Sequence, residues 1–192
     1  SSKNQQLENA EIETPFGKTD KITGGSGNYI CQSAGHFTND MQLVSVIGDD
    51  FDQSELSYLK SIGTDIDGVQ VKEGEKSFFW SGKYHMDLNR RDTLVTDLNV
   101  LAAFDPILPE KYKTAEFLIL GNIDPALQAK VISQMTERPK LIAMDTMNFW
   151  MDSAMDDLKK VLKKVDVLLV NDGEARQLSG EVSLVKAARK IM

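Results

Sequence analysis

The sequence predicts an α/β fold in which a parallel sheet carries helices on both faces and a small second sheet stands beside it. The first observation is that short, continuous apolar runs alternate with helical patterns in the second half of the chain, which is typical of βαβ units. The second is that each apolar run stops at polar residues, as buried strands do. The third is an aromatic, β-prone stretch at 68–84, which breaks the alternation and predicts the small sheet.

The first half of the chain contains one clear strand and one clear helix. A buried strand is predicted over 43–47, and it ends in a Gly-Asp-Asp turn at 48–50. Apolar residues then recur at helical spacing until Gly63, which predicts a helix over about 51–62. The other elements expected here are strands at 68–71 and 77–84, and a segment at 92–101 that fits either a strand or a short helix.

The second half is more regular. Strands are predicted at 117–120, 141–144 and 165–170. Pro125 stands in the favourable first turn of a helix that runs to about 135. An apolar stripe predicts an amphipathic helix over 152–164. The last two helices are expected at 174–178 and 182–192.

The composition fits one globular domain, residues 1–192. Of the 192 residues, 41% are hydrophobic and 27% are charged, with a formal net charge of −7. This acidic balance argues against nucleic acid or an anionic membrane as a partner. One cysteine, Cys31, and two histidines exclude a disulfide framework and argue against a Cys/His metal centre. The polar first ten residues and the short apolar runs predict neither a signal peptide nor a membrane span, so a cytoplasmic location is expected.

Polar residues follow each predicted strand of the parallel sheet. They stand at 48–50, 121–122, 145–148 and 171–174. The carboxyl ends of parallel strands share one edge of the sheet, where ligands of open α/β sheets bind. The sequence therefore predicts a shared site along this edge, although capping of the following helices explains the same residues.

Two clusters on this rim have a chemical interpretation. Asn171 and Glu174 offer oxygen ligands that suit Mg²⁺ and its waters, or they cap the next helix. Asp145 and Asn148 are suited to bind sugar hydroxyls or phosphates, or they cap the helix that follows.

A glycine-rich stretch at 24–28 precedes a helical pattern at 29–37. Glycines allow a backbone to approach a ligand closely, and a helix N-terminus adds N–H donors. The stretch is neither a Walker loop nor a dinucleotide fingerprint, because no Gly-Lys-Ser/Thr follows it and no apolar strand precedes it. A ligand-binding turn and a plain tight turn into a helix both fit.

Six segments agree in order and spacing with one known family. They are GGSGNYICQSAGHF at 24–37, VSVIGDDF at 44–51, GTDIDGV at 63–69, ILGNIDP at 119–125, MDTMNFW at 144–150 and VDVLLVNDGEARQLSG at 165–180. Together they resemble the PfkB (ribokinase-like) family of carbohydrate kinases. The last segment is the most specific, because Asn171 and Glu174 match the family's Asn-x-x-Glu motif.

The resemblance implies a Rossmann-like (ribokinase-like) parallel sheet with a small β-sheet lid, formed by about 12–23 and 68–92, through which a homodimer could form. It implies transfer of the γ-phosphoryl group of ATP to a hydroxyl of a sugar or nucleoside, assisted by Mg²⁺. The residues implied are Gly24, Gly25 and Asn28 for the substrate, Asp145, Asn148 and Asn171 for phosphate or nucleotide, and Glu174 for Mg²⁺ through water.

Two features depart from the family pattern. The family opens with a buried strand that ends in a substrate-binding Asp, whereas the first ten residues here are polar and Ala10 stands near that position. The chain also contains no Gly-Ala-Gly-Asp, the family segment that supplies the general base. We expect that base and the ATP-binding third of the fold to lie outside these residues, so that the chain alone is inactive.

Three hypotheses follow from these features. The preferred one is a PfkB-type kinase of which further segments exist. The alternative is an inactive fragment that acts as a substrate-binding or dimerisation module. A Rossmann-like nucleotide-binding protein unrelated to kinases is disfavoured, because no GxGxxG follows a strand.

Overall fold

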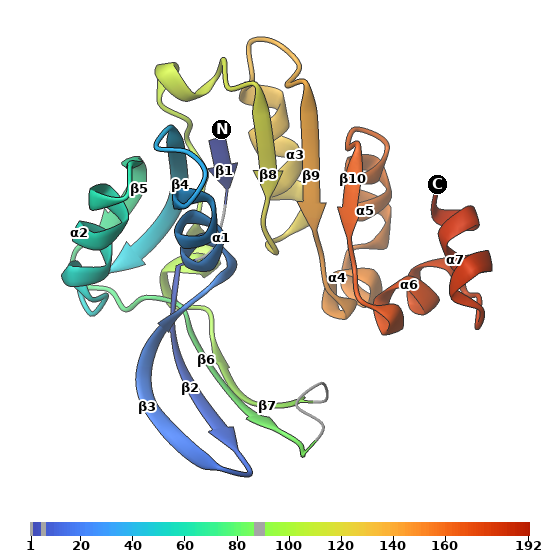
Figure 1. Cartoon of the computed structure of the whole chain (residues 1–192), viewed down its shortest axis with the longest axis horizontal. Coiled ribbons are helices and arrows are strands. Elements are labelled where there is room, and N and C mark those ends of the chain that lie inside the picture. Colours follow the sequence, from blue (N-terminus) through green and yellow to red (C-terminus); the bar gives the residue numbers. More distant parts are fainter. Residues whose placement is uncertain (1, 5–6, 87–90) are drawn as a thin grey trace.

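The computed structural model describes residues 2–4, 7–86 and 91–192, and within them it shows two sheets (Figure 1). The large sheet has the order β10-β9-β8-β1-β4-β5, and its strands are parallel. Its strands are β1 (Ser2–Asn4), β4 (Met41–Gly48), β5 (Thr64–Lys72), β8 (Phe117–Leu120), β9 (Leu141–Asp145) and β10 (Val167–Leu169). Counted along this sheet alone, the order is 3-2-1-4-5-6, that of Rossmann-type folds. The predicted α/β class is confirmed.

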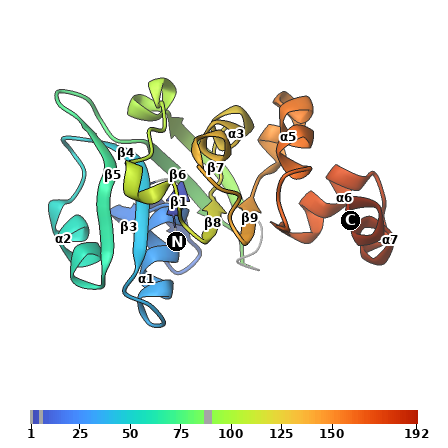
Figure 2. The same ribbon diagram turned by 90° about the horizontal axis from the view of Figure 1, so that it is seen from above.

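Helices cover the large sheet on both faces. Figure 2 shows α1 (Ser26–Gly35) and α2 (Gln53–Ser61) on one side, and α3 (Pro125–Gln134) and α5 (Met155–Leu162) on the other. The remaining helices are α4 (Asn148–Ser153), α6 (Asp172–Ser179), α7 (Leu184–Ile191) and the short 3₁₀ turns η1 (Asn99–Ala103) and η2 (Glu110–Tyr112). The helix predicted over 152–164 begins at Met155, because the chain breaks its helical path at Ala154 (φ −141°). No described helix is both long and apolar enough to span a bilayer.

The core has two layers, one on each face of the large sheet. Successive strand residues face opposite sides, so Val44 and Val46 of β4 join the cluster under α3 and α5. Leu43 and Ile47 of the same strand join the cluster under α1 and α2. This burial on both faces explains why the strand appears in the sequence as a continuous apolar run.

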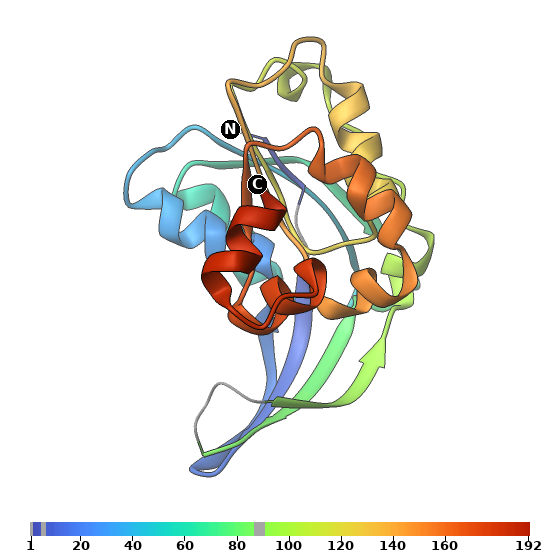
Figure 3. The same ribbon diagram turned by 90° about the vertical axis from the view of Figure 1, so that its right-hand side faces the viewer.

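The small sheet has the order β3-β2-β6-β7. Its strands are β2 (Glu8–Thr14), β3 (Gly17–Gly24), β6 (Phe79–Tyr84) and β7 (Arg91–Asp97). Figure 3 shows it curving away from the large sheet. The expected contribution of 12–23 is present, and the segment at 92–101 proves to be strand first and 3₁₀ turn afterwards.

The prediction that residues 68–71 belong to the small sheet is wrong. They form part of β5 and pair with β4 in the large sheet, from Gly68 opposite Val44 to Val71 opposite Ile47. Gly68 allows this close approach, because a Cβ there would lie 2.6 Å from the carbonyl oxygen of Leu43. The expected lid segment 68–92 therefore begins at β6, and its residues 87–90 lie outside the described part of the chain.

The polar N-terminus holds a strand that the sequence did not predict. Ser2–Asn4 form β1, which pairs in parallel with both β4 and β8 at the centre of the large sheet. The pairing uses backbone groups, so an apolar run is not required to form it. The strand order reverses on either side of β1, which is where open α/β sheets bind their ligands.

Candidate active site

A cleft of about 540 Å³ lies where the carboxyl end of β4 meets the small sheet. Its walls come from four segments: Asn9 of β2; Lys21, Ile22 and Thr23 of β3; Asn28, Tyr29 and Gln32 of α1; and Asp50, Asp52 and Glu55 around the start of α2. Most of these side chains are polar. A cleft lined by amides, hydroxyls and carboxylates is suited to a polyhydroxylated ligand.

The glycine stretch joins the two sheets beside this cleft. Gly24 ends β3, and a Cβ on it would lie 2.9 Å from Oε1 of Glu8. Gly25 has φ 91° and serves as the N-cap of α1, a backbone conformation that glycine adopts without strain. The chain therefore turns at once from β3 into α1, which carries Asn28 to the cleft wall. Gly24 and Gly25 are not among the residues that line the cleft.

Asn28 is only 2% exposed and lines the cleft. Its Oδ1 accepts a hydrogen bond of 3.0 Å from Nε2 of Gln32, one helical turn further along α1. This contact fixes which way the Asn28 amide faces, so its NH₂ group is left as the donor. The structure thus places Asn28, predicted as a substrate contact, in the cleft.

Asp50 lies at the junction of the two sheets, in the turn after β4. Its Oδ1 accepts a hydrogen bond of 2.6 Å from the backbone N–H of Ser77, and its Oδ2 accepts one of 3.2 Å from Nδ2 of Asn9. The ammonium of Lys21 donates to its carbonyl oxygen at 2.6 Å. Partial burial disfavours the charged form, but the hydrogen bonds from Ser77 and the Lys21 charge outweigh it, and the pKa of this carboxyl lies below its ordinary value.

Asn9 and Lys21 line the cleft, although the sequence did not predict them as site residues. Ala10, which stands near the expected substrate-binding Asp, is 2% exposed and is not among the cleft residues. Its neighbour Asn9 lines the cleft instead. The available signal was a polar amide, Asn9, directly beside the position where the family has a carboxylate.

The second group of predicted residues lies along the other half of the same sheet edge. Asn171 and Glu174 form a capping box at the start of α6: Oδ1 of Asn171 accepts from the Glu174 N–H, and Oε2 of Glu174 accepts from the Asn171 N–H, each at 2.9 Å. Asn148 begins α4 and donates to Gln177. The structure does not bring these residues into the cleft that holds Asn28.

Asp145 ends β9, and its carbonyl oxygen accepts a hydrogen bond of 3.0 Å from Nε2 of Gln128. The same amide nitrogen donates to the carbonyl oxygen of Gly121 at 2.7 Å. Gln128, on α3, therefore ties together the carboxyl ends of β8 and β9. This fixes the backbone from which the Asp145 side chain projects.

The donor set at the edge fits a metal ion only through water. In the described ranges 2–4, 7–86 and 91–192, no three His, Cys, Asp or Glu side chains converge to hold a metal. The capping box engages Oε2 of Glu174, which leaves Oε1 of a carboxylate that is 9% exposed. Mg²⁺ keeps several waters and takes further ligands from phosphates, so a water-mediated contact with Glu174 fits this geometry and a protein cage does not.

The strand order defines a Rossmann-type α/β protein, and its candidate site is the polar cleft between the end of β4 and the small sheet. Residues 4–191 match the family described as pfkB family carbohydrate kinase. The chain belongs to this family, and its ribokinase-like fold follows from the same comparison and from the solved structures.

Three similar proteins illustrate the relationship. The cytidine kinase of Thermococcus kodakarensis is 27% identical over 179 residues, which cover 91% of this chain and 62% of that protein. The nucleoside kinase of Methanocaldococcus jannaschii superposes with a TM-score of 0.71 at 15% identity, over 98% of this chain and 67% of that chain. An Escherichia coli protein described as a ribokinase II was solved with ATP and Mg²⁺. It superposes with a TM-score of 0.74 at 16% identity, over 99% of this chain and 68% of that chain. The chain thus spans less than two thirds of its curated relative.

Proposed function

We propose that the protein acts in transfer of the γ-phosphoryl group of ATP, with Mg²⁺, to a hydroxyl of a sugar or nucleoside. The observation that carries this proposal is the polar cleft between the two sheets, in a chain of the pfkB family. The cytidine kinase relative supports a nucleoside or sugar acceptor, and the related structure with ATP and Mg²⁺ supports the donor and the metal. Because the chain spans 62% of that relative, the activity is proposed for the whole protein.

In this proposal the polar residues at the cleft bind the acceptor, and those at the other half of the sheet edge bind phosphate and Mg²⁺. Asn28, which lines the cleft, is assigned to the acceptor, together with the backbone at Gly24 and Gly25, which leads from β3 into α1 beside it. Phosphoryl transfer depends mainly on positioning and on neutralising charge. Asp145, Asn148 and Asn171 are assigned to the phosphate side, and Glu174 to a water of Mg²⁺.

A second candidate function is a dimerisation module without catalysis. Large apolar side chains are exposed at the small sheet: Phe16, in the turn between β2 and β3, is 78% exposed, and Leu94 of β7 is 54% exposed. Exposed apolar side chains of this size are suited to contact a second copy of the chain. Analytical ultracentrifugation of the chain and of a Phe16→Ser, Leu94→Ser variant tests this: we expect a dimer that the double substitution converts to monomer.

The acceptor site is tested separately from the transfer step. Isothermal titration calorimetry with ribose, fructose, cytidine and inosine measures binding without ATP, and ADP formation measures transfer. We expect binding of at least one compound, and a loss of about tenfold or more in Asn28→Ala, because a buried amide that bonds a ligand hydroxyl is removed. The exposed Asn39, outside the cleft, provides the matched control in Asn39→Ala. Equal affinities in the two variants would contradict the assignment of Asn28.

A further inference from the structure

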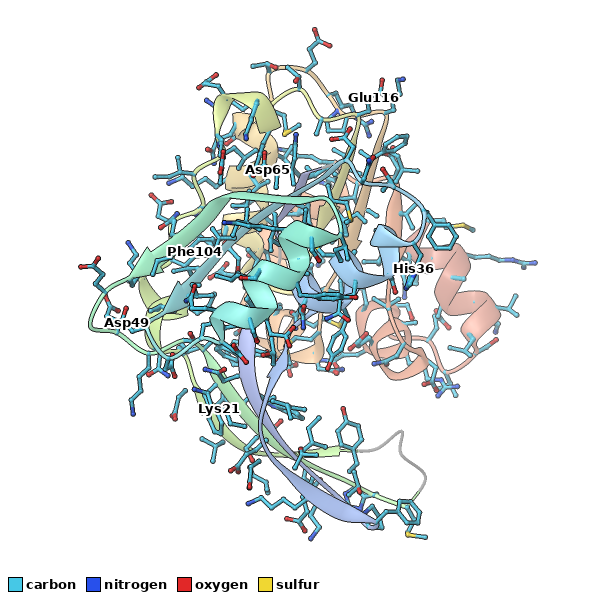
Figure 4. All side chains as sticks on the ribbon, turned by 60° about the vertical axis from the view of Figure 1, so that its left-hand side comes forward. Lys21, His36, Asp49, Asp65, Phe104 and Glu116 are labelled. Atoms are coloured by element: carbon cyan, nitrogen blue, oxygen red, sulfur yellow. The ribbon has the colours of Figure 1, made fainter. Side chains whose placement is uncertain are left out.

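Asp50 connects the end of β4 to three separate segments of the small-sheet region. Asn9 belongs to β2, Lys21 belongs to β3, and Ser77 precedes β6. Figure 4 shows Lys21 at the end of the small sheet nearest the large one. Two of these partners, Asn9 and Lys21, also line the cleft. The Asp50 carboxylate therefore joins the end of β4 to the small-sheet side of the candidate acceptor site: Asn9 and Ser77 donate to it, and the Lys21 ammonium, which bonds the Asp50 carbonyl oxygen, lies 3.6 Å from its Oδ2.

The chemistry of a carboxylate makes this contact directional. An ionised Asp only accepts hydrogen bonds, whereas an Asn amide has one donating and one accepting end. The Asn9 amide must turn its NH₂ group toward Oδ2 of Asp50, 3.2 Å away. Its Oδ1 is then the end that faces elsewhere. Asn9 is 2% exposed, so the protein around it limits its rotation once this orientation is set.

We propose that Asp50 is a positioning residue for the acceptor: it orients the Asn9 amide so that Oδ1 of Asn9 accepts a hydrogen bond from an acceptor hydroxyl. This inference rests on the proposed function in one respect, that the ligand of the cleft carries hydroxyl groups. It gives a role to Asp50, which belongs neither to the glycine-rich stretch at 24–28 nor to the Asn-x-x-Glu motif at 171–174. Asp50 acts through Asn9, and the hydroxyl bonds the amide.

The neighbouring carboxylate supplies a matched control. Asp49 stands in the same turn, and its Oδ2 accepts a hydrogen bond of 2.5 Å from the backbone N–H of Gly74. Asp49 therefore connects the end of β4 to residues 73–78, the segment that also contains Ser77. It does not line the cleft and has no contact with Asn9. If these carboxylates served only to hold the segment in place, Asp49→Asn and Asp50→Asn would behave alike.

The first measurement is the side-chain NH₂ resonance of Asn9 in a ¹H–¹⁵N spectrum of the full chain, assigned with the Asn9→Ala variant. We expect Asp50→Asn to shift this resonance, because the charged acceptor is lost. Asp49→Asn leaves it in place, and Asp50→Glu, which keeps a charged acceptor, restores part of the shift. A resonance that stays unchanged in Asp50→Asn overturns the inference without any ligand.

The second measurement is the affinity for cytidine and for ribose by calorimetry. We expect Asp50→Asn to weaken binding about tenfold and Asp49→Asn to leave it within twofold. In the Asn9→Ala background, Asp50→Asn causes no further loss, because its effect passes through Asn9. Additive losses in that double variant contradict the positioning role. Asn9→Ala keeps the Ser77 contact of Asp50, so it remains informative if Asp50→Asn does not fold.

The outcomes separate this inference from the proposed function. Binding to this chain with the expected cycle, but no ADP formation by the whole protein, removes the transfer activity and leaves the positioning role. ADP formation with additive losses removes the positioning role and leaves the activity. If none of ribose, fructose, cytidine and inosine binds the parent chain, the proposed acceptor site is contradicted and the inference fails with it.

Discussion

Substituting Gly48 by alanine tests how closely the 75–77 segment packs against the end of β4. Gly48 ends β4, and a Cβ on it would lie 2.2 Å from the carbonyl oxygen of Glu75 and 2.6 Å from the carbonyl carbon of Lys76. Both neighbours are backbone atoms, so they cannot rotate away as a side chain would. Ordinary van der Waals contact begins near 3.4 Å. The 75–77 segment must therefore move by about an ångström.

The cost follows from what this segment carries. Overpacking of a well-packed site costs about 1–3 kcal/mol. The same movement strains two hydrogen bonds of Ser77: its Oγ accepts from the Gly48 N–H at 2.9 Å, and its N–H donates to Asp50 at 2.6 Å. Such bonds contribute about 1 kcal/mol, or about 2 kcal/mol when one group is charged. Because the two bonds are weakened rather than lost, we expect Gly48→Ala to lower the free energy of unfolding by about 3–5 kcal/mol, a large share of a typical 5–15 kcal/mol.

Urea unfolding followed by far-UV circular dichroism measures this change. The control is Gly173→Ala in α6, where the nearest atom to a new Cβ is Oδ1 of Asn171 at 3.3 Å. There we expect a change of at most about 1 kcal/mol, since alanine suits a helix better than glycine does. If Gly48→Ala unfolds within 1 kcal/mol of the parent, the close approach of the 75–77 segment to β4 is not the constraint described here.

Two further predictions concern stability. Tyr112→Phe removes a fully buried hydroxyl that donates to Oδ1 of Asp65 at 2.6 Å, and we expect chemical denaturation to show a loss of about 1–3 kcal/mol. Burial opposes ionisation of Asp65, but hydrogen bonds from Lys111 and Tyr112 outweigh it and lower the pKa of that carboxyl. The stability that the Asp65 carboxylate contributes is present above its ordinary pKa and is lost as pH falls through the lowered folded value. The free energy of unfolding of Tyr112→Phe should therefore depend less steeply on pH in the acid range. Asn171→Ala breaks the capping box of α6, and hydrogen exchange in that helix should speed up in line with a loss of about 0.5–2 kcal/mol.

The sequence was informative where local pattern and structure agree. The strand β4 is a continuous apolar run because its two faces contribute to the two core clusters. The strands β8 and β9 contribute to the cluster under α3 and α5 alone, and Phe117 and Leu141 on them are exposed. Asn171 and Glu174 form the capping box that the spacing predicted as one of two interpretations. Asn28 lies in the cleft because the glycines before it force an immediate turn into α1.

The sequence was uninformative where distant segments decide the outcome. Residues 68–71 look like any short strand, and only the fit of Gly68 against β4 and Tyr112 places them in the large sheet. Asn9 and Lys21 reach the cleft because β2 pairs with β3 and, in parallel, with β6. No residue spacing encodes these long-range pairings. Of the cleft residues, Asn28 was therefore predicted from the sequence, whereas Asn9 and Lys21 were not. The metal and phosphate roles of Asp145, Asn148 and Glu174 stay predictions.

The position of β1 sets the order in which the protein can assemble. Its backbone pairs on one side with β4, at Ser2 opposite Gln42, and on the other with β8, at Ser2 opposite Leu118. A ribosome that adds about 5–20 residues per second delivers β8 several seconds after β4. During that interval one edge of β1 has no partner strand, and an unpaired edge invites wrong pairing. The first strand of the chain is thus enclosed on both sides only after β4 and β5 have already paired, and its free edge stays open to wrong pairing until β8 emerges.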